Sequence, residues 1–285
     1  MGALYSQFFV TPTCPTKGQT VIVTGSNVGI GFEAAKHFVR LNAAKVILAM
    51  RNLEAGEAAK RSIETSLNRP GSCEVWELDL ASFDSVKAFA DRASKLPRLD
   101  ILVENAGIAT YNFELAEARN TFLLGLLLLP KLQATAQAFQ TSSPHLSVVT
   151  SDVHAWTSFP EWKADNTFVA LNDRATADMR ERYSTSKLLE VLISQLSREA
   201  GLGLRLMIFL FGRTAEVGGR TLLSAAGAGP ESHGAYFLDG KVNNAALSPF
   251  VRSEAGARAQ EKVWRELSEI LEDIQPGSTH VLSSS

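Results

Sequence analysis

The chain has 285 residues, of which 45% are hydrophobic and 20% are charged, and its formal net charge is −2. A chain of this length can bury a large core, and we expect a single α/β domain that spans residues 1–285. The near-neutral charge provides no basic surface, so neither nucleic acid nor an anionic membrane is an expected partner.

Apolar stretches of strand length alternate with longer amphipathic segments along the chain. This alternation predicts βαβ units, and hence a doubly wound parallel sheet with helices on both faces. In chain order, the predicted strands cover 19–24, 45–50, 73–78, 99–103, 146–150 and 235–242. The predicted helices cover 29–41, 54–67, the segment from the Ser82 cap to about 95, 115–139, 182–200 and 254–274.

Three segments fall outside this alternation. Residues 1–18 read as an N-terminal extension, and 152–180 and 201–233 read as irregular segments on the substrate side. Segment 152–180 carries Trp156, Phe159 and Trp162, and these aromatic residues could either line an apolar substrate cleft or anchor the segment.

Several classes of site are not expected. Cys14 and Cys73 are far apart, and the five histidines have no second ligand at metal spacing, so we predict neither a disulfide framework nor a metal site. The cysteine usage fits a reducing compartment such as the cytoplasm. The longest apolar run, 122–130, is shorter than the roughly 20 residues of a membrane span. Residues 1–6 match the myristoylation pattern loosely, without a polybasic second signal.

A glycine-rich turn, TGSNVGIG, follows the first predicted strand and opens the first predicted helix at 24–31. Glycines let the backbone approach a pyrophosphate, and a helix N-terminus offers free N–H groups. We therefore predict a dinucleotide site here; an ordinary glycine-rich turn is the alternative. The predicted cofactor-binding residues of the turn are Gly25, Ser26, Asn27, Gly29, Ile30 and Gly31.

The residues after the next two strands bear on the choice of cofactor. Arg51 stands where an NAD-binding protein would have a carboxylate for the ribose hydroxyls, so NADP(H) is the predicted cofactor. A solvated loop cation is the alternative for Arg51. Asp79 is placed to bind the adenine amine, or else it is a turn residue before the Ser82 cap.

Tyr183 and Lys187 are four residues apart in a predicted helix. Positions i and i+4 share a helix face, so the lysine ammonium can lie beside the phenol and favour its phenolate. Such a phenol is suited to general acid-base chemistry.

Five motifs occur in the order found in short-chain dehydrogenases/reductases: the turn at 24–31, Asp79-Leu80, Asn105-Ala106-Gly107, Ser151, and Tyr183 with Lys187. The match spans nearly the whole chain. The sequence most resembles the fungal branch related to retinol dehydrogenase and WW-domain oxidoreductase-like enzymes, through segments such as VILAMRN and LDILVENAG.

The resemblance implies a Rossmann-type domain and an NADP(H)-dependent carbonyl/alcohol oxidoreductase acting on a small molecule, often in fungal secondary metabolism. Asn105 would belong to the cofactor site. Tyr183 would donate a proton to the carbonyl oxygen, Lys187 would hold the ribose hydroxyls, and Ser151 would hydrogen-bond the substrate oxygen. A strand-end hydroxyl that satisfies the backbone is the alternative for Ser151. A homo-oligomer would form through helices 115–139 and 182–200.

The sequence departs from the family pattern at three places. Glu104 stands where the family often has Asn. Asn105 still supplies the amide, so we expect this replacement to have little effect on the site. The segment 113–121 lacks the usual catalytic Asn, and Asn120 cannot be aligned with it. The sixth strand and its Pro-Gly are not recognisable after Arg198.

The third departure leaves two interpretations of residues 204–211. Periodicity favours a buried strand that fills the vacant place, whereas the resemblance favours a substrate-lid helix. If the strand were absent, Phe211-Gly212 could not supply the missing wall of the nicotinamide pocket. The alternative function is therefore a catalytically impaired nucleotide-binding pseudoenzyme or a truncated family member.

Overall fold

One eight-stranded sheet forms the centre of the computed structural model, which describes residue 14 and residues 16–107, 117–139, 143–199, 205–208, 215–229 and 232–282. The strand order is β3-β2-β1-β4-β5-β6-β7-β8. The strands are β1 (Thr20–Thr24), β2 (Lys45–Met50), β3 (Cys73–Glu77), β4 (Ile101–Glu104), β5 (His145–Val148), β6 (Arg205–Ile208), β7 (Ala235–Leu238) and β8 (Lys241–Val242). Neighbouring strands from β3 to β7 are parallel, and β8 pairs with β7 in the antiparallel direction.

Helices connect the parallel strands. The α-helices are α2 (Gly29–Arg40), α3 (Leu53–Leu67), α4 (Phe83–Ser94), α5 (Glu117–Ala138), α6 (Thr167–Leu171), α7 (Arg182–Glu199), α8 (Ala215–Ala226) and α9 (Glu254–Ile274). Short 3-10 helices are η1 (Asp152–Ala155), η2 (Pro160–Lys163), η4 (Asn244–Ala246) and η5 (His280–Leu282). None of the helices in these described ranges is both long enough and apolar enough to cross a membrane.

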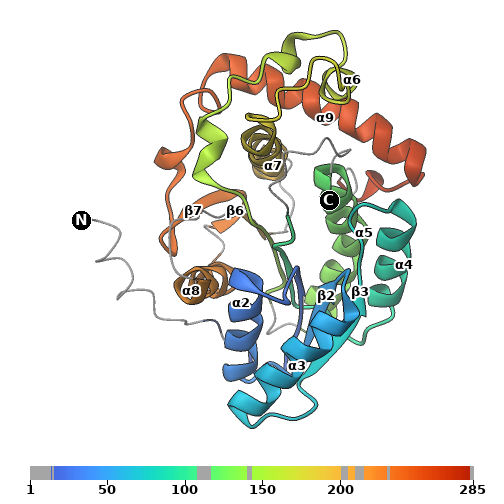
Figure 1. Ribbon diagram of the computed structural model, residues 1–285, viewed down its shortest axis with the longest axis vertical. Coiled ribbons are helices and arrows are strands. Elements are labelled where there is room, and N and C mark those ends of the chain that lie inside the picture. The colour runs from blue at the N-terminus through green and yellow to red at the C-terminus, as the bar shows by residue number, and fades with distance from the viewer. Residues whose placement is uncertain are drawn as a thin grey trace.

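The strand residues alternate between two buried cores. Val21 and Val23 of β1 pack with α2, α3 and α8 on one face of the sheet, whereas Ile22 packs with α4, α5, α7 and α9 on the other. This alternation follows from the period of two in a strand, because successive side chains point to opposite faces. Figure 1 shows α2, α3 and α8 grouped on one side of the molecule and α4, α5 and α7 on the other. The predicted doubly wound fold is confirmed.

The sheet order reverses direction at β1, which pairs with both β2 and β4. Val23 is in register with Leu48 on one side and with Val103 on the other, so the three strands end at the same edge. In open α/β sheets, ligands bind at the carboxyl edge beside such a reversal of strand order. The glycine-rich turn follows β1 at this edge.

The sixth parallel strand is present. Residues 205–208 pair with β5 and β7, with Val148 in register with Ile208 and Ile208 with Tyr236. The interpretation of this segment as a strand is therefore confirmed, and a lid helix over these residues is wrong. Phe211-Gly212 lies outside the described residues.

Two other boundaries differ from the prediction. Segment 201–233 is not irregular throughout, because it contains β6 and the twelve-residue helix α8, whose Gly218 and Gly219 pack closely against α2. Segment 235–242 is a hairpin of two strands, because Asp239 and Gly240 adopt positive φ angles between them.

Segment 152–180 contains short helices, and α9 fastens it to the core. The Lys262 ammonium donates to the carbonyl oxygens of Trp162 and Ala164, and the Glu266 carboxylate accepts from the Thr167 N–H at 2.8 Å. Phe159 is fully buried, whereas Trp156 is 72% exposed. Phe159 therefore anchors the segment, and α9 holds that segment in place.

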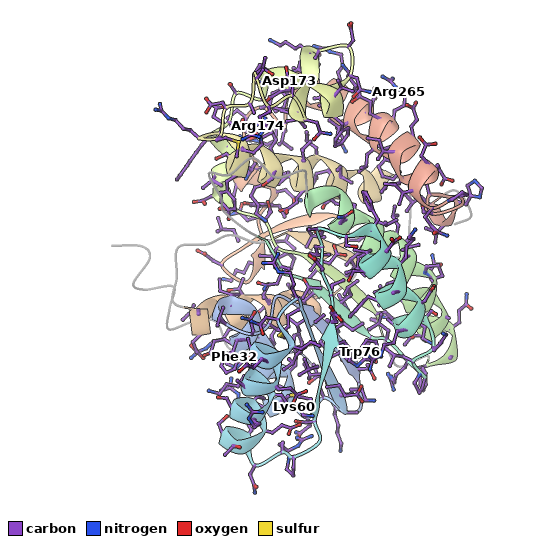
Figure 2. The ribbon with its side chains drawn as sticks, turned by 45° about the vertical axis from the view of Figure 1, so that its right-hand side comes forward. Phe32, Lys60, Trp76, Asp173, Arg174 and Arg265 are labelled. Carbon is purple, nitrogen blue, oxygen red and sulfur yellow. The ribbon has the colours of Figure 1, made fainter. Side chains whose placement is uncertain are left out.

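We expect Leu267→Ala in α9 to lower the free energy of unfolding by about 2–5 kcal/mol, because Leu267 is fully buried in the core beneath this segment. Arg265→Ala is the control, since Arg265 lies on the exposed side of α9 (Figure 2) and should change stability by no more than about 0.5 kcal/mol. Urea denaturation of both variants measures the difference in stability. Equal urea midpoints for the two variants would contradict the packing of Leu267 in the core.

Candidate functional site

The glycine-rich turn depends on close approach of two backbone segments. Gly25 and Gly29 have φ angles of 64° and 65°, in the left-handed region that favours glycine. A Cβ atom on Gly25 would lie 2.9 Å from Cα of Ala106, which belongs to the loop after β4. A larger residue at position 25 would therefore push the turn away from that loop.

Gly31 serves the start of α2 in a similar way. A Cβ atom at this position would lie 2.5 Å from the carbonyl oxygen of Gly25 and would also collide with the side-chain nitrogen of Asn105. Only glycine lets the first turn of α2 pack so closely on the preceding loop.

Hydrogen bonds from the loop after β4 hold the turn. The Thr24 hydroxyl accepts from the backbone N–H groups of Asn105 (3.0 Å) and Ala106 (2.9 Å). The Asn105 side-chain amide donates to the carbonyl oxygens of Thr24 (3.0 Å) and Gly25 (3.1 Å). Asn105 therefore braces the turn. The family resemblance assigned Asn105 to the cofactor site but did not specify this role.

The N-terminus of α2 is suited to an anion. Val28 occupies the cap position with its side chain 69% exposed, and no side chain in the described residues caps the helix there. The first turn also contains no acidic residue. Free N–H groups and the positive end of the helix dipole therefore face the carboxyl edge of the sheet.

The other turn residues have different surroundings. The buried Ser26 hydroxyl donates to the Val23 carbonyl oxygen at 2.9 Å, so it closes the turn. Ile30 is half-buried and packs against Gly218 of α8. Asn27 is half-buried between the exposed Val28 and Ser26.

Arg51 follows β2 at the same edge and is exposed. Within the described part of the chain, no carboxylate forms an ion pair with its guanidinium. The next residue, Asn52, caps α3 by accepting from the Ala55 N–H at 3.0 Å. The guanidinium is therefore available to an anionic group of a ligand.

Asp79 is engaged in the turn before α4. One carboxylate oxygen accepts from the Ala81 N–H at 3.0 Å, and the Asp79 N–H donates to the Ser85 hydroxyl at 2.9 Å. Ser82 caps α4, as predicted, by accepting from the Ser85 N–H. These contacts match the alternative interpretation, in which Asp79 is a turn residue before the Ser82 cap.

Helix α7 places Lys187 beside Tyr183, with the ammonium nitrogen 5.8 Å from the centre of the phenol ring. The lysine nitrogen also donates to the Val149 carbonyl oxygen at 3.0 Å. A Cβ atom on Gly107 would lie 3.5 Å from the same nitrogen. Lys187 therefore lies directly behind the loop that braces the glycine-rich turn.

Ser151 is buried after β5 and caps η1. Its hydroxyl donates to the Asp152 carboxylate at 3.1 Å and accepts from the Val153 N–H at 3.4 Å. These contacts match the alternative in which the hydroxyl satisfies local polar groups.

Two buried acids were not predicted as site residues. Glu190 accepts from Lys187 through both oxygens at 2.9 Å, and burial raises its pKa against the opposing effect of the lysine charge. Glu104 is fully buried at the end of β4, and burial together with the charge of Glu190 raises its pKa well above the usual range. A carboxyl group at this position must be desolvated, which the sequence did not reveal. The expectation that Glu104 has little effect on the site stays a prediction.

Asn120 lies on α5 and is buried. Its side-chain amide donates to the Leu80 carbonyl oxygen, which belongs to the loop after β3. The side chain fastens α5 to that loop, and the contact gives it no role beside Lys187. Among the described residues, no group of three or more acidic, histidine or cysteine side chains could hold a metal ion.

Comparison with known proteins gives consistent matches. The family model for short chain dehydrogenase matches residues 19–158. Short-chain dehydrogenase anuD of Penicillium roqueforti is 43% identical over 98% of this chain and 85% of its own length. Short chain dehydrogenase atnD of Emericella nidulans is 40% identical over 80% of this chain and 86% of its own length. The alignment with the Penicillium protein has 326 positions, more than the 285 residues of this chain, so it opens gaps in this chain.

Solved structures share the fold at lower identity. A metagenomic short-chain oxidoreductase in complex with NADP has a TM-score of 0.56 and 22% identity, covering 79% of this chain and 97% of its own. A Shigella flexneri short chain dehydrogenase complexed with NADP has a TM-score of 0.55 and 21% identity, covering 80% and 99%.

We expect Thr24→Val to reduce the free energy of unfolding by about 1–3 kcal/mol, because it leaves the N–H groups of Asn105 and Ala106 without their acceptor. Thr24→Ser keeps the hydroxyl and is the matched control. Denaturant titration compares the three proteins. A valine variant as stable as the serine variant would show that the hydroxyl does not hold the turn.

Proposed function

Because this chain belongs to the short-chain dehydrogenase/reductase family, we propose that it is an NADP(H)-dependent oxidoreductase that interconverts a carbonyl group and a primary or secondary alcohol. The main support is the connection of Lys187 to the glycine-rich turn through one loop. Gly107 lies against the lysine nitrogen, and Ala106 lies against Gly25. A nucleotide on the turn would therefore reach the helix that carries Tyr183.

The described residues fit a dinucleotide. The uncapped start of α2 can receive a pyrophosphate, and close packing at Gly25 and Gly31 keeps the turn compact. No carboxylate of the described segments pairs with the exposed Arg51, so its guanidinium can meet a 2′-phosphate, which supports NADP(H) over NAD(H). The structural neighbours that hold NADP support the same choice. For Asp79 we keep the adenine contact as a proposal, made through the carboxylate oxygen that does not accept from Ala81.

The catalytic proposal assigns each step to a residue of this chain. In reduction, Tyr183 donates its phenol proton to the carbonyl oxygen, and the positive charge of Lys187 stabilises the phenolate that remains. Ser151 hydrogen-bonds the same oxygen once its hydroxyl turns away from Asp152. A bound nicotinamide supplies the hydride. In alcohol oxidation, the Tyr183 phenolate accepts the proton.

The substrate is proposed as a class only. An apolar or aromatic carbonyl compound of fungal secondary metabolism fits the resemblance and the fungal relatives. Trp156 is the exposed aromatic of segment 152–180 and could contact it. We also propose a cytoplasmic location and a homo-oligomer that pairs through α5 and α7.

A catalytically impaired, nucleotide-binding member of the family is the second candidate. Two observations favour it: the gaps that the aligned relatives open in this chain, and the use of Asn120 to bind Leu80. In addition, all three protons of Lys187 already have acceptors, so a ribose hydroxyl would have to displace one of them.

We expect Tyr183→Phe to lower the rate of NADPH-dependent carbonyl reduction by roughly 100- to 10,000-fold while NADPH still binds. Ser66→Ala is the control, because it removes an exposed hydroxyl near the end of α3 and should leave the rate near that of the wild type. The assay follows NADPH oxidation with a panel of ketones and aldehydes. Equal rates for Tyr183→Phe and the wild type would favour the impaired member.

We expect Arg51→Ala to weaken NADPH binding by roughly 10- to 100-fold and to leave NADH binding unchanged, since only NADPH carries the 2′-phosphate. Arg61→Ala, which removes an exposed arginine of α3, serves as the control. Isothermal titration calorimetry gives both affinities. An equal loss of affinity for NADPH and NADH, or no loss for either, would contradict the assignment of Arg51 to the 2′-phosphate site.

A further inference from the structure

Three ionisable groups lie together in the interior directly behind Tyr183. Lys187 and Glu190 come from α7, and Glu104 comes from the end of β4. Their exposed fractions are 5%, 6% and 3%, so all three are removed from water. Buried charges are retained at low cost only when they are paired and hydrogen-bonded.

Lys187 and Glu190 satisfy this condition as a pair. The ammonium donates two hydrogen bonds of 2.9 Å to the two oxygens of Glu190 and one of 3.0 Å to the Val149 carbonyl. An ammonium has three protons, so every donor of Lys187 is used. The pair is therefore neutral overall, and the ammonium nitrogen is fixed from two sides.

Glu104 is in a different position, because neither of its carboxyl oxygens has a hydrogen-bond partner among the described residues. Helix α5 faces it with Gly125, where a Cβ atom would lie 3.2 Å from one carboxyl oxygen and 3.3 Å from Leu146 of β5. From α7, the charge that acts on Glu104 is that of Glu190. Lys187, the nearby cation, already has its full set of acceptors.

A second negative charge would be unfavourable in this place. Burial and the charge of Glu190 both raise the pKa of Glu104, and no described cation is left to compensate it. Lys187 compensates the charge of only one of the two buried carboxyl groups, so the other must hold a proton to avoid an unpaired buried charge. The proton belongs on Glu104, since Glu190 is the one bonded to the ammonium.

We propose that Glu190 is a positioning residue that holds Lys187 beside Tyr183, and that Glu104 is held in its neutral, protonated form, which keeps this buried cluster neutral. The positioning part rests on the proposed function, whereas the protonation of Glu104 does not. In this arrangement, a carboxylate fixes the lysine in a chain where the family's Asn is not recognisable. The carboxylate also moderates the electrostatic effect of Lys187 on the phenol.

The protonation of Glu104 is tested by the pH dependence of stability, which needs no nucleotide. A carboxyl group whose pKa is raised by folding contributes stability that is complete below its unfolded value, near 4.5, and is lost as pH rises toward the folded value. Glu104→Gln carries no titrating proton at this place. We therefore expect the urea midpoint of the wild type to fall above pH 4.5 relative to that of Glu104→Gln.

The control for this experiment is Glu269→Gln, which changes an exposed carboxylate of α9 and should keep the wild-type pH dependence. A Glu104→Gln variant with the same pH dependence as the wild type would overturn the proposed protonation of Glu104. Because these measurements use the full chain without cofactor or substrate, their failure is distinct from failure of the proposed function.

The positioning role is tested with Glu190→Gln and Glu190→Asp in alcohol oxidation, each combined with Glu104→Gln so that Glu104 cannot ionise in place of Glu190. Removing the carboxylate leaves the charge of Lys187 uncompensated beside Tyr183, which favours the phenolate. We expect the rising limb of the pH–rate profile to move to lower pH by roughly one unit in Glu190→Gln. Glu190→Asp retains the charge and should restore the wild-type limb.

If Glu190 had only a structural role, both variants would have lower rates but the rising limb of the pH–rate profile would not move. This result would overturn the positioning role. If oxidation cannot be measured, a double-mutant cycle on stability with Lys187→Met and Glu190→Gln tests the same contact. Additive effects of the two changes would then contradict the assignment, and a less-than-additive loss would support it.

Discussion

The contact between the ends of β1 and β4 is the constraint on which the site depends. Thr24 accepts two backbone hydrogen bonds from the loop after β4, and Asn105 returns two to the turn. These bonds are possible because β1 and β4 are parallel neighbours in register. They set the distance between the glycine-rich turn and Gly107, and through Gly107 the distance to Lys187.

A second constraint is electrostatic. The interior behind Tyr183 contains one lysine and two carboxyl groups, and their charges balance only when one carboxyl is protonated. The cluster joins β4 to α7, so the loop that braces the turn and the helix that carries the catalytic pair are linked both by packing and by charge. In this account, Glu104 is a neutral polar group that takes the place of a family amide.

Local pattern predicted most of the fold. Apolar runs of strand length predicted the parallel strands, including β6, and the amphipathic period predicted α9 from Glu254 to Ile274 without error. Helix α8 was missed because its two glycines weaken helix propensity, and they are present because the helix packs on α2. The pairing of Glu190 with Lys187 has i, i+3 spacing, which was available in the sequence. The burial of Glu104 beside them depends on tertiary structure, so no local pattern could have revealed it. The contacts of Asn105 were equally beyond reach, because they join its side chain to the backbone of a distant loop. The contacts of Asp79 and Ser151 are local, and they match the alternatives stated from the sequence.

Titration of the wild-type protein with NADPH and NADH, followed by nucleotide fluorescence, tests the central claim most directly. We expect saturable binding of one NADPH per chain, with NADH binding more weakly by at least roughly tenfold because it lacks the 2′-phosphate. Failure of both nucleotides to bind would contradict a formed cofactor site at the turn, and every catalytic role assigned to Tyr183, Lys187 and Ser151 would be lost with it.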